Sequence, residues 1–508
     1  MLPRLFLDHT NLIKKKTGIL KNLAQLFADQ IIAQHRNFEP LDRTYLINKI
    51  YALVGEKNLQ APIAQLNLLE LVNALVQSAQ SNHKINKTKA AANILAAQLT
   101  DLYTPRPSQI NAAFWNFYQI SPQAATDYFY QICQENNYIQ TAANAKNISY
   151  NTQTKYGELE ITINLAKPEK DPQKIARASR QTTHTYPADQ LCMDNEGYLG
   201  RADFAARTNH RIIRLNLGGE TWGFQYSPYA YFPEHCIFLS QAQRPMHIDS
   251  LTFSNLFEII QLFPHYFVGS NADLPIVGGS VLSHDHYQGG RHVFPMMQAP
   301  LRKKFHMNAF PNIQAGIVKW PLSTIRLTSD EISPLIPASQ QILTQWQHYS
   351  DETVAVRAWS GNVAHHTITP IVYRSSQQWV IDLVLRDNQT SKQYPDGIFH
   401  PHADVQHIKK ENIGLIEVMG RAILPGRLQS ELLEVKKFLL QQPNQIADYH
   451  LPWAQQLQQT VLITPTNVEE IIKKSLGQIF ARVLEDAGVF KDDKRGHLAF
   501  ARFVQTLN

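Results

Sequence analysis

The sequence pattern is compatible with an α+β protein, because it has mainly helical regions at both ends and a mixed region of short strands and helices between them. Residues 5–134 are rich in Ala, Leu, Gln, Asn and Lys and poor in glycine, and parts of them carry apolar residues at helical spacing. From about residue 148, polar and apolar residues begin to alternate, as they do in half-buried strands. The tail after residue 428 again has a helical pattern.

In the N-terminal region, residues 1–147, the clearest helical spacing lies in residues 63–76 and 90–102. Residues 105–107, Pro-Arg-Pro, interrupt the region, because proline fixes φ and suits the first turn of a helix rather than its interior. Ser108 follows directly and could cap a restarted helix. We therefore expect helices on both sides of a local break.

The mixed region begins with residues 158–163, whose alternation of polar and apolar residues predicts a half-buried strand. Residues 167–172, Lys-Pro-Glu-Lys-Asp-Pro, have the composition of a turn or linker. Further strands are predicted at 212–217, 236–239, 367–373 and 379–385, and a helix at 412–422. We divide the chain into a helical N-terminal region, two mixed halves and a helical C-terminal region, at residues 1–147, 148–320, 321–427 and 428–508.

The composition is that of a soluble globular protein with two or three domains or a fused pair of similar halves, because 508 residues exceed one ordinary core. The hydrophobic share of 44% and the charged share of 18% are ordinary for such proteins. The formal charge of +6 comes from 48 basic and 42 acidic residues without a long basic block. This pattern favours small anionic substrates over nucleic acid as the partner.

The three cysteines, Cys133, Cys192 and Cys236, are too widely spaced for a disulfide framework or a Cys-x-x-Cys zinc site, which fits a reducing cytoplasm. Near the N-terminus, Asp8 and His9 end a short apolar run. No later stretch approaches the roughly 18 uninterrupted apolar residues that a membrane span requires. We expect a cytoplasmic protein that is neither exported nor inserted into a membrane.

The most informative segment is residues 271–290, which contains His284-x-His286-x-Gln288 between two glycine pairs. In an extended strand alternate side chains share a face, so the three would point at one spot. The glycines let the backbone approach a ligand and offer N–H groups to phosphate oxygens. A His-x-His pair alone is more often a surface or core pair, but Gln288, both glycine pairs and Asn271 together favour a phosphate-handling site.

His286, central in the triplet, is the predicted nucleophile, because a neutral imidazole can attack phosphorus and form a phosphoramidate. His284 would order the site or ligate a metal. Gln288 can donate a hydrogen bond to a phosphoryl oxygen, but its carboxamide cannot protonate a leaving group at neutral pH. The reaction should therefore expel a group that leaves well unaided, such as a sugar phosphate.

Residues 273–290 resemble the signature of the class II galactose-1-phosphate uridylyltransferases. Further segments resemble the same family: 209–213, 222–229, 234–236 and 409–419. The resemblance implies two histidine-triad-like halves around mainly antiparallel sheets, one of which carries the nucleophile, with helical additions at both ends. It also implies a homodimer.

The activity implied by the resemblance is a ping-pong exchange in the Leloir pathway of galactose use. UDP-glucose would uridylylate His286 and release glucose 1-phosphate, and galactose 1-phosphate would then take the uridylyl group to give UDP-galactose. In the related histidine-triad hydrolases a third histidine occupies the place of Gln288 and can act as an acid. Its absence here favours transfer over hydrolysis.

Other site residues follow from the same resemblance. Asn271 would lie by the nucleotide, although Asp273 competes for that place, and Gly279 and Ser280 would lie at the approach to the α-phosphate. Glu417 resembles a hexose-contacting glutamate of the class I enzymes, with a solvated helix face as the alternative. Three arginines could pair with diphosphate oxygens or form ordinary surface ion pairs: Arg207, Arg211 and Arg244.

Metal content stays open. Class I enzymes often hold zinc through Cys-x-x-Cys plus histidines, and this chain has no such cysteine pair, so His284 could have only a hydrogen-bonding role. No cofactor is certain, and a divalent metal is an option. Asp382 and Val384 stand where a second class I metal site has its ligands. Other candidate ligands are His365, His366, His400, His402 and His407.

Two alternatives have distinct signatures. A histidine-triad nucleotide hydrolase or phosphorylase would consume UDP-glucose steadily without a sugar-phosphate acceptor. A non-catalytic nucleotide-sugar or RNA-binding protein would bind UDP tightly without exchanging glucose 1-phosphate with UDP-glucose.

Overall fold

The computed structural model describes residues 22–61, 65–166, 186–279 and 281–508, and the linker predicted at 167–172 lies outside them. The chain divides into two compact units. The smaller unit comprises Met1–Arg106, Glu135–Tyr138 and Glu196–His210. The larger unit comprises Pro107–Gln134, Ile139–Asn195 and Arg211–Asn508.

The smaller unit is built from helices whose apolar faces share one core. These helices are α1 (Leu23–Gln34), α2 (Arg43–Val54), α3 (Leu68–Ser81) and α4 (Lys89–Asp101). A capping box begins α3: the Asn67 side chain accepts from the Glu70 N–H, and the Glu70 carboxylate accepts from the Asn67 N–H. α3 and α4 confirm the helical spacing predicted at 90–102 and in the described part of 63–76.

The larger unit begins with α5 (Pro107–Tyr118) and α6 (Pro122–Glu135), followed by the short α7 (Thr141–Asn144). α5 and α6 each start at a proline, whose fixed φ and missing N–H suit a first turn. The break predicted at 105–107 is confirmed. Ser108 is not the cap we expected, because Pro107 already starts the helix and Ser108 lies within its first turn.

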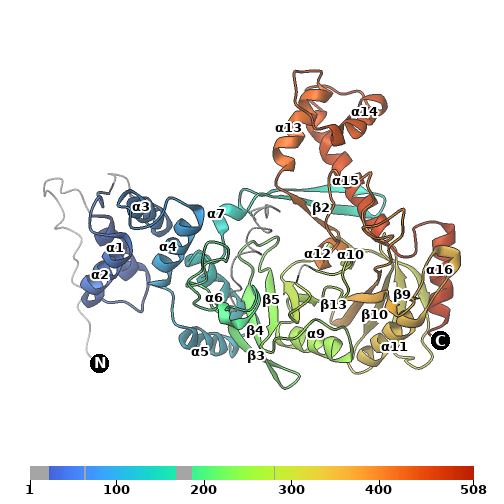
Figure 1. Ribbon diagram of the computed structural model, residues 1–508. Helices are drawn as coiled ribbons and strands as arrows, with labels where there is room; N and C mark the ends of the chain where they lie inside the picture. The colour runs from blue at the N-terminus through green and yellow to red at the C-terminus, as the bar shows by residue number, and fades with distance from the viewer. Residues whose placement is uncertain (1–21, 62–64, 167–185, 280) are drawn as a thin grey trace. The chain divides into compact units, whose positions relative to one another are not determined.

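A ten-stranded antiparallel sheet runs through the larger unit in the order β3-β4-β5-β7-β6-β13-β14-β10-β9-β8 (Figure 1). Its first half contains β3 (Ile213–Leu217), β4 (Glu220–Tyr226), β5 (Cys236–Ser240), β6 (Phe267–Gly269) and β7 (His286–Gly290). Its second half contains β8 (Leu301–Phe305), β9 (Gln314–Val318), β10 (Thr324–Ser329), β13 (His366–Ser375) and β14 (Gln378–Asp387).

The two halves of this sheet have the same topology. From the outer edge inward, each half places its strands in the order first, second, third, fifth, fourth, and the two fourth strands, β6 and β13, pair in the middle. A helix joins the third strand to the fourth in each half, α9 (Ser250–Leu262) in one and α11 (Leu335–His348) in the other. This repeat confirms an α+β fold with two similar halves and mainly antiparallel pairing.

The strands predicted at 212–217, 236–239, 367–373 and 379–385 are confirmed by β3, β5, β13 and β14. The structure differs at the boundary drawn at residue 320. β8 and β9 precede that residue but pair within the second half of the sheet. The second half therefore begins with β8, after the short helix α10 (Pro295–Gln298).

A separate three-stranded sheet joins distant parts of the chain. β1 (Ile148–Thr154) and β2 (Gly157–Asn164) form a hairpin, and β15 (Arg421–Pro425) adds to β2 in parallel. β2 confirms the strand predicted at 158–163. The helix predicted at 412–422 shrinks to α12 (Leu415–Val418), because Gly420 has φ +105° and the residues after it pair with β2.

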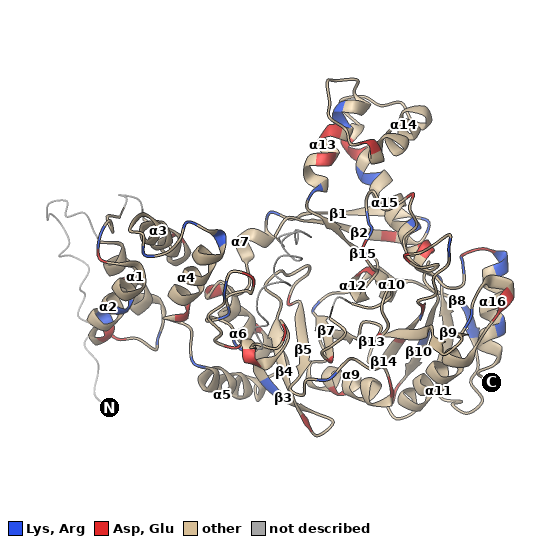
Figure 2. Cartoon of the chain, viewed as in Figure 1, with Lys and Arg blue, Asp and Glu red and all other residues tan. Residues whose placement is uncertain are grey.

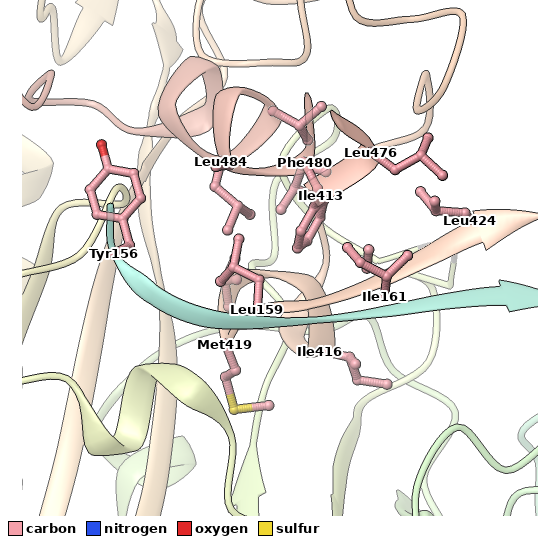
Figure 3. Close-up of a cluster of buried hydrophobic side chains, with 14 of the residues drawn as sticks. Tyr156, Leu159, Ile161, Ile413, Ile416, Met419, Leu424, Leu476, Phe480 and Leu484 are labelled. Carbon is pink, nitrogen blue, oxygen red and sulfur yellow. The ribbon is translucent and has the colours of Figure 1, made fainter. Parts of the chain in front are cut away.

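One apolar core connects this sheet to α12 and to α15 (Val468–Ala487) (Figure 3). In the close-up, β2 runs between Phe480 and Leu484 of α15 on one side and Ile416 and Met419 on the other. Burying each such side chain stabilises the fold by roughly 1.5–3 kcal/mol. The core therefore fixes the position of α12, whose first residues contact Asn271.

The helical tail predicted at 428–508 is confirmed by α13 (Leu428–Leu439), α14 (Leu451–Thr460), α15 and α16 (Lys494–Gln505). Figure 2 shows both acidic and basic residues on α13. Within the described ranges, no helix combines the length and the apolar composition needed to cross a bilayer.

Candidate active site

β7 carries His286 and Gln288 in the first half of the sheet. His286 pairs with Leu239 of β5, and Gln288 pairs with Gly269 of β6. Side chains alternate along a strand, so His286 and Gln288 point to the same face. The intervening Tyr287 points to the other face, where its ring stacks on another aromatic ring at a centroid distance of 4.9 Å. The strand begins at His286, so His284 lies just before it.

The His286 imidazole is held in a single tautomer. Its Nδ1 lies 2.8 Å from the main-chain oxygen of His284. A carbonyl oxygen can only accept, so Nδ1 carries the proton. No described residue bonds Nε2, which keeps its lone pair. Burial lowers the pKa of His286, which favours the neutral ring at neutral pH.

His284 has the opposite protonation state. Its Nδ1 lies 2.8 Å from Asp189 Oδ2, and its Nε2 lies 2.8 Å from the Ser240 main-chain oxygen. Both partners are acceptors, so both ring nitrogens donate and the ring is an imidazolium. Burial alone would lower the pKa of His284, but the bonds to Asp189 and Ser240 outweigh it and raise the pKa. Neither nitrogen offers a lone pair to a metal.

Asp189 is a site residue that the sequence did not reveal. It lies 95 residues before His284, outside the motif. Its Oδ1 accepts from the N–H groups of Leu191 and Cys192 at 2.6 and 2.9 Å, which anchors the carboxylate. Burial alone would raise the pKa of Asp189, but the bond from His284 and the backbone donors lower it. The carboxylate is therefore a fixed counter-ion for the His284 imidazolium.

Gln288 is half-buried, and its side-chain oxygen faces His235. Gln288 Oε1 lies 3.2 Å from His235 Nε2. Because a carboxamide oxygen only accepts, His235 is the donor, and the NH2 group of Gln288 is left for another acceptor. We did not predict a role for His235, although it stands in a segment, 234–236, that resembles the family.

Asn271 lies two residues beyond β6 and is buried. Its Oδ1 accepts from the Leu415 N–H at 2.9 Å, which ties the chain after β6 to the start of α12. Asp273, the competing residue, accepts from the Ile248 N–H at 2.9 Å and from the Thr367 hydroxyl at 2.5 Å. These bonds give Asp273 a structural role. Because Oδ1 of Asn271 is bonded to Leu415, the amide nitrogen of Asn271 is left on the side of Gly279.

Gly279 lies directly against Asn271. A Cβ atom at this position would come within 2.6 Å of Asn271 Nδ2. Only glycine therefore allows the loop to close on the Asn271 side chain. Ser280, which we predicted beside the α-phosphate, lies outside the described residues.

Glu417 is buried rather than on a solvated helix face, so that alternative is wrong. Its Oε2 accepts from the Gly414 N–H at 2.9 Å, and its Oε1 lies 2.5 Å from Lys409 Nζ. Burial alone would lower the pKa of Lys409, but the attraction of Glu417 outweighs it and raises the pKa. Both carboxylate oxygens thus have protein partners, and a hexose hydroxyl would share them.

The three predicted arginines have different surroundings. Arg244 pairs with Glu220 at 2.7 Å and with Asp285 at 3.2 Å, so two carboxylates already hold its guanidinium. Arg211 is buried within the larger unit. Arg207 belongs to the smaller unit. Their contacts with a diphosphate stay predictions.

The candidate metal ligands do not converge. In the part of the chain that the structure describes, no three His, Cys, Asp or Glu side chains are placed to share a metal ion. Asp382 instead forms two bonds with Arg326, at 2.7 and 2.8 Å. Four of the five candidate histidines bond separate protein partners: His365 bonds Asn388, His366 bonds Asp387, His400 bonds the Pro401 oxygen and His402 bonds the Ile398 oxygen. The fifth, His407, lies against the ring of His450.

The chain is similar to known proteins over most of its length. The sequence model described as "Galactose-1-phosphate uridyl transferase, N-terminal domain" matches residues 36–245, and its C-terminal counterpart matches residues 258–455. The galactose-1-phosphate uridylyltransferase of Pediococcus pentosaceus is 57% identical over 483 residues, covering 95% of this chain and 99% of the relative. Those of Lactiplantibacillus plantarum and Enterococcus faecalis are 58% and 56% identical, covering 95% and 94% of this chain and 99% and 97% of theirs.

Among solved structures, yeast Ap4A phosphorylase matches with 12% sequence identity and a TM-score of 0.33, covering 60% of this chain and 92% of that one.

Proposed function

The chain belongs to the galactose-1-phosphate uridylyltransferase family, a family of nucleotidyltransferases in galactose metabolism, and we propose that it works by ping-pong exchange through His286. In the first half-reaction Nε2 of His286 attacks the α-phosphorus of UDP-glucose. A bond forms between Nε2 and phosphorus, and the bond from phosphorus to glucose 1-phosphate breaks. In the second half-reaction a phosphate oxygen of galactose 1-phosphate attacks the same phosphorus, which releases UDP-galactose and free His286.

The tautomer of His286 is the observation that supports this proposal most directly. The proton on Nδ1 is held by the His284 main-chain oxygen at 2.8 Å, so Nε2 is the nitrogen with a lone pair. Its lowered pKa keeps this lone pair available at neutral pH. Once Nε2 is uridylylated, the ring becomes cationic, and the Nδ1–H bond to the carbonyl stabilises that charge. The imidazole is thus prepared both to attack and to leave.

Gln288 supports transfer in preference to hydrolysis. Its NH2 group can bind a non-bridging phosphoryl oxygen, where negative charge increases during attack. It has no acidic proton for a leaving group, and a sugar phosphate needs none. The histidine-triad hydrolase or phosphorylase considered above is therefore not favoured. The family assignment also disfavours the non-catalytic binding protein.

A labelling experiment tests the proposal. Protein incubated with UDP-glucose that carries ³²P in the α-phosphate should retain label that is stable in base and lost in acid, as expected of a phosphoramidate. Adding galactose 1-phosphate should move the label into UDP-galactose. Steady consumption of UDP-glucose without an acceptor, with no retained label, would support the hydrolase instead.

Asp189→Asn should lower the pH at which activity is lost on the alkaline side of the pH–rate profile. In the wild type the raised pKa of His284 means that the imidazolium, and its stabilising bond to Asp189, persist until the pH rises through that pKa. Without the carboxylate the pKa of His284 falls, so the alkaline limb of the pH–rate profile should move to lower pH. We expect kcat at neutral pH to fall about 10- to 100-fold, as for other residues that orient an active-site histidine.

NMR titration of the His284 ring and a pH–rate profile check this prediction. Asp194→Asn provides a matched control, because Asp194 is exposed on the same segment and makes no bond to His284. An unchanged His284 pKa in Asp189→Asn would contradict the assigned ion pair.

We also propose an oligomeric state, a cellular location and further substrate-binding residues. The resemblance supports a homodimer with Asn271, Gly279 and Glu417 around the substrates and Arg211 and Arg244 near the diphosphate, and the widely spaced cysteines fit a cytoplasmic location. Light scattering of the purified protein in solution would determine the oligomeric state.

A further inference from the structure

We propose that His235 is a positioning residue that fixes the carboxamide of Gln288 with its NH2 group, and not its oxygen, toward the phosphoryl group. The inference rests on the proposed function, because it assigns His235 a task in the same transfer. It concerns a residue that lies just before β5, the strand next to β7, and not one in the triplet itself.

Without a partner that fixes its carboxamide, Gln288 could turn either its NH2 group or its oxygen toward the phosphoryl group. The two ends of a carboxamide have nearly the same shape, but the NH2 end donates hydrogen bonds and the oxygen end only accepts them. If the oxygen faced a phosphoryl oxygen, two electron-rich atoms would oppose each other in the transition state. A partner that can only donate to the oxygen removes this second orientation.

The contact in the structure has this property. His235 Nε2 lies 3.2 Å from Gln288 Oε1, and this oxygen can only accept, so Nε2 carries the proton. No described residue accepts from the Gln288 NH2 group. The donor end of Gln288 is therefore the end without a partner among the residues that the structure describes. It extends from the same face of the sheet as His286.

The surroundings of His235 hold its ring in place. The residue is 3% exposed. Its ring stacks on Tyr231 at a centroid distance of 5.4 Å and lies against Phe232 at 4.7 Å. The His235 N–H donates to the Phe232 oxygen at 3.3 Å, and its own oxygen accepts from the Ser227 N–H at 2.8 Å. Side chain and backbone are both fixed, so Nε2 has little freedom to leave Gln288.

The end of β7 leaves space for the chain segment just before His235. Gly290 has φ +146°, and a Cβ atom there would come within 2.6 Å of the Glu234 main-chain oxygen. Glu234 is itself held by Tyr266 at 2.5 Å and by Arg291 at 3.0 Å. Gly290 thus allows Glu234, the residue before His235, to pack on the strand, which brings the side chains of His235 and Gln288 together.

A phenylalanine could fill the place of His235 between the two aromatic rings. What distinguishes histidine there is the N–H group aimed at Gln288. His235→Phe therefore keeps the packing and removes the donor, whereas His235→Gln restores a donor of comparable reach. Gln288→Ala, alone and combined with His235→Phe, shows whether the effect acts through Gln288.

The test is the first-order rate at which His286 acquires label from α-³²P UDP-glucose, measured by rapid quench on full-length protein. We expect His235→Phe to slow this step about 10- to 100-fold. This effect is no larger than the rate loss of about 10²- to 10³-fold that follows removal of a transition-state donor itself. The dissociation constant for UDP-glucose should be nearly unchanged. His235→Gln should recover most of the rate. In the Gln288→Ala background, His235→Phe should cause little further loss.

Two results would overturn the inference. One is a wild-type labelling rate in His235→Phe. The other is an equal slowing by His235→Phe with and without Gln288, which would indicate a packing role and would be accompanied by a lower Tm. If the wild type acquires no label, the proposed function fails together with the inference. If the wild type labels normally and His235→Phe matches it, the inference fails alone.

Discussion

His286→Ala is expected to lose uridylyl transfer by on the order of 10⁴-fold or more, because the variant lacks the atom that forms the covalent intermediate. The backbone of β7 should be preserved, since its pairing with β5 and β6 uses main-chain groups. Removing the ring leaves a cavity and destabilises the fold, so its Tm should be measured with its activity. Binding of UDP-glucose should persist, because Gln288 and the surrounding glycines remain.

Two assays distinguish loss of chemistry from loss of structure. The variant should bind UDP-glucose in calorimetry, yet acquire no ³²P label and show no exchange between glucose 1-phosphate and UDP-glucose. His348→Ala is the matched control, because His348 is exposed on α11 and distant in sequence from the motif. Retention of label by His286→Ala would reject His286 as the nucleophile.

The parts of the site that the sequence predicted are those that local pattern specifies. Two members of the triplet lie on one short strand, and period-two alternation alone places His286 and Gln288 on the same face. The same rule located β2. Alternation could not give the protonation of either histidine, because that depends on the main-chain oxygens of His284 and Ser240.

The parts that were missed depend on contacts between distant residues. Asp189 and His235 lie 95 and 53 residues from their partners, and neither stands in a pattern that points to His284 or Gln288. The same limit affected residues 412–422, where parallel pairing with β2 converts the end of an expected helix into β15. Glu417 is buried because Lys409 provides a counter-ion, which spacing alone could not indicate.

Gln288→Glu is expected to reduce kcat at neutral pH by on the order of 10³-fold, although the two side chains have nearly the same size. One oxygen of the new carboxylate would accept from His235 as the amide oxygen does. The other would take the place of the NH2 group and put negative charge against the phosphoryl oxygens. Losing one such donor typically costs about 10²- to 10³-fold, and the repulsion adds to that cost.

The pH dependence of the variant's activity tests whether the loss comes from the missing donor. Protonating the introduced carboxyl restores a donor, so activity of the variant should rise as the pH falls, until His286 is itself protonated below its lowered pKa. Gln298→Glu, an exposed change of the same kind on α10, should leave the rate and its pH profile unchanged. Wild-type kcat in Gln288→Glu would mean that the NH2 group does not contact the phosphoryl oxygen. A loss that is independent of pH would mean that Gln288 acts through packing and not through its donor.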